Sequence, residues 1–529
     1  MARVEDHIRL TFSVHGLHGT RRDGDAGTQV HTLSHHSPSQ LAVSPRNAHP
    51  RAMLASLYET HPVAARYHVL LTYTLMSALQ GMIWTLPGAL TNTYESVYGL
   101  SGDTISLLLN YGPILYLVVL VPVSLHLDRH GIRGQTLLAI ALVCVANALR
   151  LFANDASPAS VALLHVSFIL NASAGPAAMG IPSKLAADWF PPEERTLACA
   201  IAALGNSSGA LILYLAIAAA FPNPTRADNF GLNVFLAVLS AINGVAAVLY
   251  FPSHPVEAPS ASAALAAGAA SSVTLSALTR AIGRLMRNGS YLAIFAAYAL
   301  STGEFNCVNS LLPQAIGNLG EANPQGVAGW VSFASNAAAV VTGVIVARLT
   351  GAKMAADAGA QKRVLVGSLA TVGVFVLAFA IALAPGVVAP GSAGIALVAT
   401  FYVAAGAAQG AASPLLFEVA AEHTGAALLS RTASADDGGE KGAGDDEVHP
   451  TIPVGSMLML LTAASNLVSL VALLMPNASF FAWATWAGAA IFLGGAALLA
   501  AVLPASSPRY EFDIAAGDGE RLLEINGGD

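Results

Sequence analysis

The sequence predicts an all-α polytopic membrane protein with twelve membrane-spanning helices in two halves of six. Three observations carry this prediction. Of 529 residues, 55% are hydrophobic and only 10% are charged, against about 25% charged in soluble domains, and the mean hydropathy is +0.60. Apolar segments recur at close to the roughly 20 residues that cross a bilayer. The longest inner loop before the C-terminal tail, 252–289, divides these segments six and six.

The first predicted span follows a polar stretch, 1–65, that is rich in His, Ser and Arg. This composition predicts a disordered tail; a metal site is the alternative, although the histidines are irregularly spaced. The stretch has no sustained apolar run, so we expect no signal peptide. The predicted spans are 67–89, 104–126, 134–153, 158–181, 196–220, 231–251, 290–314, 326–349, 364–385, 392–419, 454–475 and 479–503.

Loop charges alternate along the chain and predict its orientation. Arginine and lysine gather in the loops after spans 2, 4, 8 and 10 and before span 7, whereas acids dominate the opposite loops. Since cationic loops stay in the cytosol, both termini are expected there. The exceptions are Arg226 and Arg150, the latter at the outer end of span 3.

The polar stretches divide the chain into five parts. A cytosolic linker, 252–289, has an Ala/Ser/Pro composition typical of flexible segments, and it separates an N-terminal half, 66–251, from a C-terminal half, 290–503. An acidic, Gly-rich insertion in the second half, 424–452, predicts a disordered loop. The remaining stretch, 504–529, predicts a cytosolic tail.

A short motif in this tail bears on localisation. Asp518 and Glu520 precede Leu522 and Leu523, which fits an acidic dileucine sorting signal. The motif predicts a sorting adaptor as a partner and an endolysosomal membrane as the location. The plasma membrane is the alternative.

Several stretches resemble a known family. The turn from Asp128 to Arg133, DRHGIR, is similar to the loop after helix 2 of major facilitator superfamily transporters, with Ser124 in place of that pattern's glycine. GIPSKLAADWFPPEERTLACAIAALGNSSGA (180–210), RLMRNGSYLAIFAAYALSTGEFNCVNSLL (284–312) and PLLFEVAAEHT (414–424) resemble solute carrier family 49 of that superfamily.

The resemblance implies the major facilitator fold and a central site with alternating access. Members of the family are associated with choline and ethanolamine, haem or pyridoxine transport. The chain is therefore expected to be a secondary transporter of a small organic solute. A non-transporting membrane receptor or solute sensor of the same fold is the alternative.

The resemblance also implies a conformational clamp near the cytosolic face. Asp128, Arg129 and Arg133 occupy the positions at which the superfamily clamps its helices. Glu418 and Glu422 match the family's acid pair and lie four residues apart, on one helix face. We expect both acids to pair with inner-loop arginines rather than to contact solute.

Four residues are predicted to bind the solute. Trp84 matches a family tryptophan, and its ring face can hold a quaternary ammonium by cation–π attraction; packing at the membrane interface is the alternative. The family's tyrosine of helix 7 falls on Asn306, and its glutamine of helix 11 on Asn466. These amides, with Gln80 on the first span, suit a polar neutral or weakly basic solute. Interhelical hydrogen bonding is their alternative role.

Glu304 lies near the middle of the seventh predicted span. Because a carboxylate in a membrane is costly, an acid there is a functional candidate by default, and we expect proton coupling at Glu304. Glu304 and Asn306 lie about 200° apart around a straight helix. They can face one cavity only if the helix unwinds at Gly303.

Enzymatic chemistry is not expected, because the sequence has no nucleophile elbow, metal-ligand cluster or phosphate loop. We expect neither a cofactor nor a bound metal. The three cysteines, Cys144, Cys199 and Cys307, lie in apolar runs and are expected to pack there. The predicted partners are a small-molecule solute and membrane lipid, without nucleic acid.

Overall fold

In the part of the chain that the computed structural model describes, every regular element is an α-helix. The stretch 1–61, the acidic residues after Asp436 and the Leu522-Leu523 motif lie outside the described residues. The described ranges are 62–221, 225–268, 279–280, 282–283, 285–356, 358–436, 454–473 and 478–504.

The N-terminal half contains eight helices: α2 (Pro62–Ala89), α3 (Thr91–Tyr98), α4 (Gly102–Arg150), α5 (Pro158–Ser173), α6 (Gly175–Gly180), α7 (Pro182–Trp189), α8 (Pro192–Ala220) and α9 (Arg226–Leu249). Two predicted spans meet within α4 at Gly131, whose φ of 66° and ψ of −172° break the helix. Glycine adopts this conformation readily because it has no Cβ. The charged turn therefore reverses the chain between the two parts of α4.

A tight turn joins α4 to α5. Asp155 accepts hydrogen bonds from the hydroxyls of Ser157 and Ser160, each at 2.6 Å. These bonds lower the pKa of the Asp155 carboxyl to about 2. Ser157 also caps α5 by accepting a bond from the amide of Ser160 at 3.2 Å, which satisfies a free N–H of the first turn. The turn thus fixes where α5 begins.

The linker and C-terminal half contain α10 (Ala261–Gly268), α12 (Gly289–Asn318), α13 (Pro324–Ala356), α14 (Ala358–Ala382), α15 (Ser392–Asp436), α16 (Val454–Leu473) and α17 (Ala478–Val502). Helix α10 lies within the stretch expected to be a flexible linker. Helix α15 passes its expected end at 419, so residues 424–436 are helical rather than disordered. Their alanines and leucines favour helix strongly.

Nine helices in the described ranges are long and apolar enough to cross a membrane. One of them, α4, holds two predicted spans. Helix α12 coincides with another predicted span, and α16 contains the shorter apolar segment Met459–Leu470. The all-helical membrane architecture is confirmed, whereas the count of twelve spans stays a prediction.

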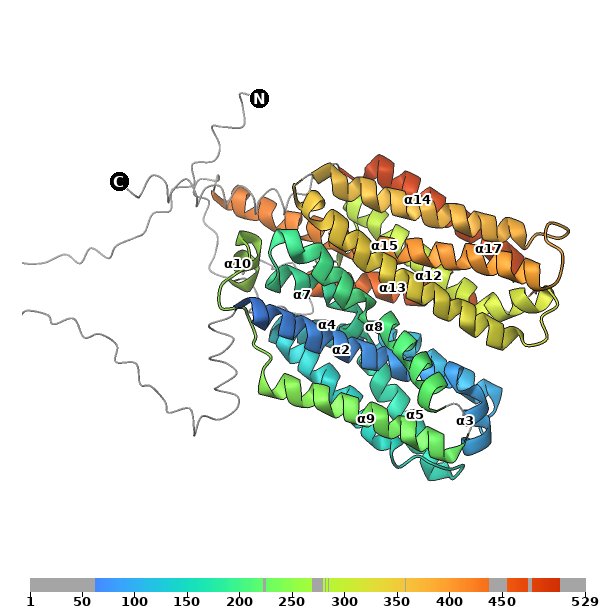
Figure 1. Ribbon diagram of the computed structural model, residues 1–529. Coiled ribbons are helices and arrows are strands. Elements are labelled where there is room, and N and C mark those ends of the chain that lie inside the picture. The colour runs from blue at the N-terminus through green and yellow to red at the C-terminus, as the bar shows by residue number, and fades with distance from the viewer. Residues whose placement is uncertain are drawn as a thin grey trace, which may run out of the picture. The chain divides into compact units, whose positions relative to one another are not determined.

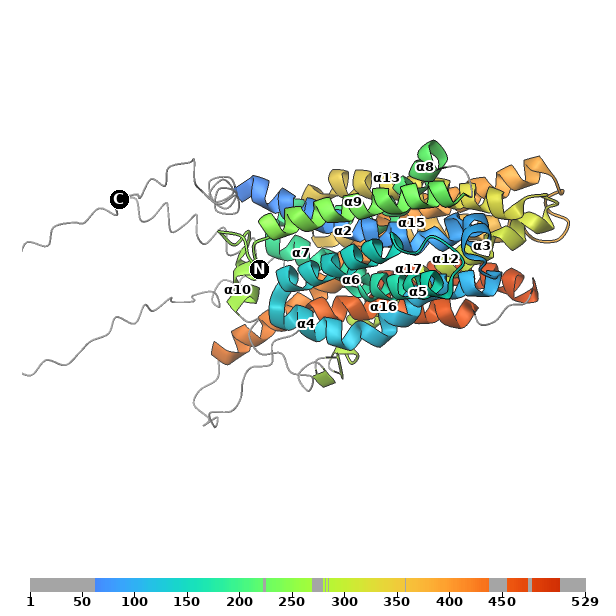
Figure 2. The ribbon, with the colours of Figure 1, turned by 90° about the horizontal axis from the view of Figure 1, so that it is seen from below.

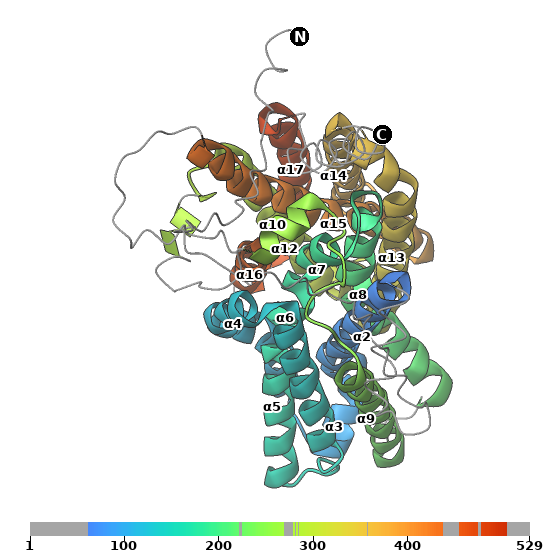
Figure 3. The ribbon, with the colours of Figure 1, turned by 90° about the vertical axis from the view of Figure 1, so that its left-hand side faces the viewer.

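The helices form two groups that contact each other along several helix pairs, including α6 with α16 and α8 with α15 (Figures 1 and 3). In the first group α2 packs against α8, and α4 packs against α5 and α9. In the second, α13 packs against α15, and α14 packs against α15 and α17. The groups meet where α8 packs against α13 and where α4 packs against α16 (Figure 2). We call the end that carries the Gly131 turn, α7 and α10 the linker end; α3 lies at the opposite end (Figure 1).

Candidate functional site

Met459 joins the two halves near the linker end. It is fully buried on α16, and its carbonyl oxygen accepts a hydrogen bond from the Tyr116 hydroxyl of α4 at 3.3 Å. Its sulfur lies 3.6 Å from the Ser124 hydroxyl. A Cβ at Gly180 of α6 would overlap the Met459 side chain. Met459 therefore occupies a notch between α4 and α6.

A buried charge cluster makes a second connection between the halves. Arg195 of α8 and Glu422 of α15 are both buried, with Nη1 of the arginine 4.0 Å from Oε1 of the glutamate. Arg195 Nη2 also donates to the Ser260 hydroxyl at 3.1 Å. Glu418, one turn before Glu422, is buried as well. The cluster ties α8, α15 and the segment before α10 together, and its clamp role remains a proposal.

The other expected clamp residues lie on the Gly131 turn. Asp128 is buried, Arg133 is half-buried and Arg129 is exposed. The three therefore share the linker end with Arg195 and Glu422. Their clamp role stays a prediction.

The indole of Trp84 is held at its Nε1 edge and is partly exposed. Its Nε1 donates to the carbonyl oxygen of Leu109 on α4 at 3.0 Å. The ring lies over Gly112, where a Cβ would be only 2.5 Å from Nε1. The Trp84 residue remains 38% exposed. The missing side chain at Gly112 thus leaves room for the ring, and the hydrogen bond fixes its orientation.

Gln80 lies one turn before Trp84 but is buried in a network between helices. Its Oε1 accepts from Asn206 Nδ2 of α8 at 2.6 Å, and its carbonyl oxygen accepts from Asn171 Nδ2 of α5 at 3.1 Å. A Cβ at Gly175 would lie 3.7 Å from Gln80 Nε2. The network positions α2 against α5 and α8, which is the alternative role expected of such amides. Solute binding by Gln80 stays a prediction.

Asn306 and Asn466 come from the second half. Asn306 is exposed on α12 and Asn466 is half-buried on α16. Helix α12 continues through Gly303 without unwinding. Gly303 packs on Val468, and its carbonyl oxygen accepts from the Ser469 hydroxyl at 3.1 Å. The straight helix therefore places Asn306 and Glu304 on different faces.

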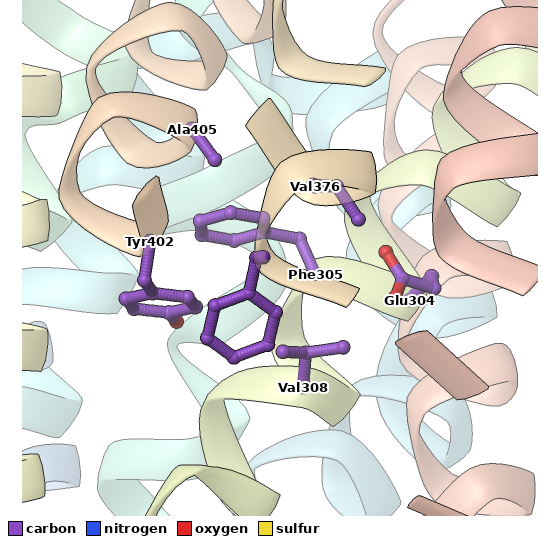
Figure 4. Close-up of a pocket in the computed structure, with 7 residues that line it drawn as sticks. Glu304, Phe305, Val308, Val376, Tyr402 and Ala405 are labelled. Carbon is purple, nitrogen blue, oxygen red and sulfur yellow. The ribbon is translucent and has the colours of Figure 1, made fainter. Parts of the chain in front are cut away.

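Glu304 faces the interior of the C-terminal half and is only 6% exposed. It borders a cavity of about 10 Å³ with apolar and aromatic walls (Figure 4), which is room for about one water. Neither carboxyl oxygen has a hydrogen-bond partner among the described residues. A Cβ at Gly488 of α17 would overlap the carboxyl group. The cavity is lined by Glu304, Phe305, Val308, Val376, Phe379, Tyr402 and Ala405.

Two residues, Met459 at the interface of the halves and Tyr402 at the cavity, gave no clear signal in the sequence. Met459 is one apolar residue in an apolar run, so nothing in the pattern indicates a contact between halves. Tyr402 stacks on Phe305 with ring centroids 5.4 Å apart, and its hydroxyl donates to Asn309 Oδ1 at 2.8 Å.

In the described ranges, no group of three or more His, Cys, Asp or Glu residues is placed to hold a metal ion.

The chain belongs to the Major Facilitator Superfamily, whose sequence profile matches residues 70–435. This is a family of transporters rather than of enzymes, and the chain is an integral multi-pass membrane protein. The fold agrees: the structure of the proton:xylose symporter XylE superposes with a TM-score of 0.61 at 14% identity, over 85% of this chain and 99% of that chain.

Within this superfamily the chain is distantly homologous to solute carrier family 49. It is 32% identical over 298 residues to the solute carrier family 49 member 4 homolog of Xenopus tropicalis, which covers 54% of this chain and 63% of that protein. It is 27% identical over 266 residues to the choline/ethanolamine transporter flvcr2b of Danio rerio, covering 49% and 53%. The matches thus span between half and two thirds of these relatives.

Proposed function

We propose that this protein is a secondary transporter that moves a small organic solute by alternating access. The observation that carries the proposal is the interface between the halves at the linker end. There, Met459 and the Arg195–Glu422 pair join helices of opposite halves through contacts that each involve at least one side chain. Such contacts break and reform without unfolding either half, as rocking of two bundles requires.

The proposed solute site lies between α2 of one half and α12 and α16 of the other. Trp84 offers an exposed ring face, and Asn306 offers an exposed amide in mid-helix. An exposed amide at membrane depth is favoured where it borders water rather than lipid. Asn466 adds a second amide. The relatives named as choline/ethanolamine transporters, together with the family's association with pyridoxine and haem, define the solutes to test.

The test is uptake by the purified full-length protein in liposomes. Labelled choline, ethanolamine, pyridoxine and haem are offered one at a time, with empty liposomes as the control. Counterflow, in which unlabelled solute inside accelerates entry of labelled solute, is expected for at least one of them. Binding without counterflow would favour the receptor or sensor alternative. Absence of both for all four solutes would contradict the proposed solute classes.

We further propose that Glu304 couples transport to protons. Its carboxyl is buried beside an apolar cavity with no partner among the described residues, where an ionised form is costly. Glutamine has nearly the shape of the protonated acid but cannot release a proton. Glu304→Gln is therefore expected to keep counterflow and to lose stimulation of uptake by an imposed pH gradient. Unchanged stimulation would exclude Glu304 as the coupling site.

The membrane in which the protein acts, and its orientation there, also remain proposals. The loop charges favour cytosolic termini. The dileucine motif favours an endolysosomal membrane over the plasma membrane. Microscopy compares the location of the tagged full-length chain with that of its Leu522→Ala, Leu523→Ala variant. If the motif directs endolysosomal sorting, the variant is expected to move to the cell surface.

A further inference from the structure

Arg150, at the end of α4 opposite the linker end, is a buried cation that the transport proposal does not use. It is 1% exposed. Its Nη2 donates to Asn233 Oδ1 of α9 at 2.7 Å, and its guanidinium carbon lies 5.5 Å from the ring centroid of Phe168 on α5. The two remaining nitrogens, Nε and Nη1, have no hydrogen-bond partner among the described residues.

These contacts leave the charge of Arg150 unbalanced. The guanidinium stays protonated in proteins, and a buried charge is costly unless an opposite charge compensates it. Asn233 and Phe168 are neutral. None of the ion pairs between described residues includes Arg150; they are Arg66–Glu194, Lys184–Asp188 and Arg195–Glu422.

A second unused donor lies near the same phenylalanine ring. Tyr94 of α3 is fully buried, and its hydroxyl has no hydrogen-bond partner among the described residues. Its ring centroid is 6.4 Å from that of Phe168. Burial raises the pKa of the Tyr94 hydroxyl, and the charge of Arg150 opposes this increase. The hydroxyl is therefore a neutral O–H donor within electrostatic range of the guanidinium.

The neighbouring tyrosine has its own partners. The Tyr98 hydroxyl donates to the carbonyl oxygen of Ala153 at 2.8 Å and accepts from Asn229 Nδ2 at 2.8 Å. Tyr98 thus needs no further group. The N–H groups on Nε and Nη1 of Arg150 and the O–H of Tyr94 are therefore donors available to a ligand here.

We infer that Arg150 and Tyr94 bind a small monovalent inorganic anion between α3 and α4. A halide accepts several hydrogen bonds and also supplies the missing negative charge, whereas a water molecule supplies only the hydrogen bonds. The site belongs to the N-terminal half alone. Its existence is therefore independent of which solute the protein moves.

Chloride is the probe. The melting temperature of the purified full-length protein is measured as sodium chloride replaces sodium gluconate at constant ionic strength. The wild type is expected to gain thermal stability with a saturating dependence on chloride, because a ligand that binds only the folded state stabilises it. Arg150→Met is expected to abolish this dependence. Equal melting temperatures in chloride and gluconate would overturn the inference.

Two further variants complete the test. Tyr94→Phe removes only the hydroxyl, so it is expected to fold and to weaken chloride binding about tenfold, as loss of one hydrogen bond to a charged group does. Arg226→Met removes an exposed arginine near the same end and is expected to retain the full chloride effect. A chloride effect that survives unchanged in Tyr94→Phe would overturn the site, even if Arg150→Met fails to fold.

Discussion

Met459 on α16 fills the space that a side chain at Gly180 on α6 would need. The absence of a Cβ at position 180 therefore lets the two halves approach each other at the linker end. Overpacking of such a tight contact costs about 1–3 kcal/mol. Gly180→Ala is expected to weaken the contact between the halves by that order.

Cys199 provides a native readout of this change. It is buried on α8, with its sulfur 3.9 Å from the carbonyl oxygen of Pro414 on α15. In a chain that lacks the other two cysteines, maleimide should modify Cys199 faster in Gly180→Ala than in the parent. Gly367→Ala is the control, because in the described part of the chain no atom beyond the local helix backbone lies within 4 Å of the added Cβ. Equal labelling rates in all three proteins would contradict the role of Met459.

Loss of the buried Arg195–Glu422 pair is also expected to weaken the contact between the two halves at the linker end. Glu422→Gln keeps the shape of the side chain and removes its charge, which leaves Arg195 without this counter-charge. Breaking a buried pair in this way costs about 3–5 kcal/mol. Cys199 labelling should accelerate and the melting temperature should fall.

The matched control for that pair is Glu194→Gln. Glu194 pairs with Arg66 at 2.9 Å, but both side chains are partly exposed, so we expect a change of at most about 1 kcal/mol. Equal effects of the two substitutions would argue against a clamp that depends on burial.

Substitutions of Trp84 are expected to weaken solute affinity in steps that follow the loss of the aromatic ring. If its ring face holds a cationic solute, Trp84→Phe should retain part of the attraction and Trp84→Ala should lose it. An energy of about 1–2 kcal/mol for a cation–π contact corresponds to a roughly tenfold increase in KM at unchanged expression. Trp330→Ala, at an exposed site on α13, is expected to leave KM unchanged. An unchanged KM in Trp84→Ala would remove Trp84 from the site.

The hydrogen bond between Gln80 and Asn206 predicts an effect on stability rather than on affinity. Asn206→Leu leaves the buried Oε1 of Gln80 without this donor, at a cost of about 1–3 kcal/mol, whereas in Gln80→Leu the half-buried Asn206 still donates to the carbonyl oxygen of Ser77 at 3.0 Å. A double-mutant cycle by thermal unfolding should give a coupling energy of at least about 0.5 kcal/mol. Asn336→Leu is the control, because among the described residues its side chain donates to the carbonyl oxygen of Ser332 on its own helix. Additive effects would instead favour independent roles for Gln80 and Asn206.

The helical membrane fold was predictable because it depends on the length and composition of segments. Periodicity also separated Glu304 from Asn306 correctly, since residues two positions apart lie on opposite sides of a regular helix. Partners across the bundle were not predictable in this way. Gln80 and Asn206 are both polar residues within apolar runs, and nothing in either pattern indicates that they bond to each other. Gly180 and Met459 carry no signal at all, because their contact depends on how two distant helices approach.

Helix α15 does not stop at the edge of the bundle. It continues from Glu422 to Asp436 as a stalk that projects from the linker end (Figure 1), roughly 20 Å along its axis. A stalk rooted beside the Arg195–Glu422 pair acts as a lever arm. A small rotation of α15 near Glu422 therefore displaces Asp436 by a larger distance. A spin label or fluorescent label near Asp436 can detect that displacement.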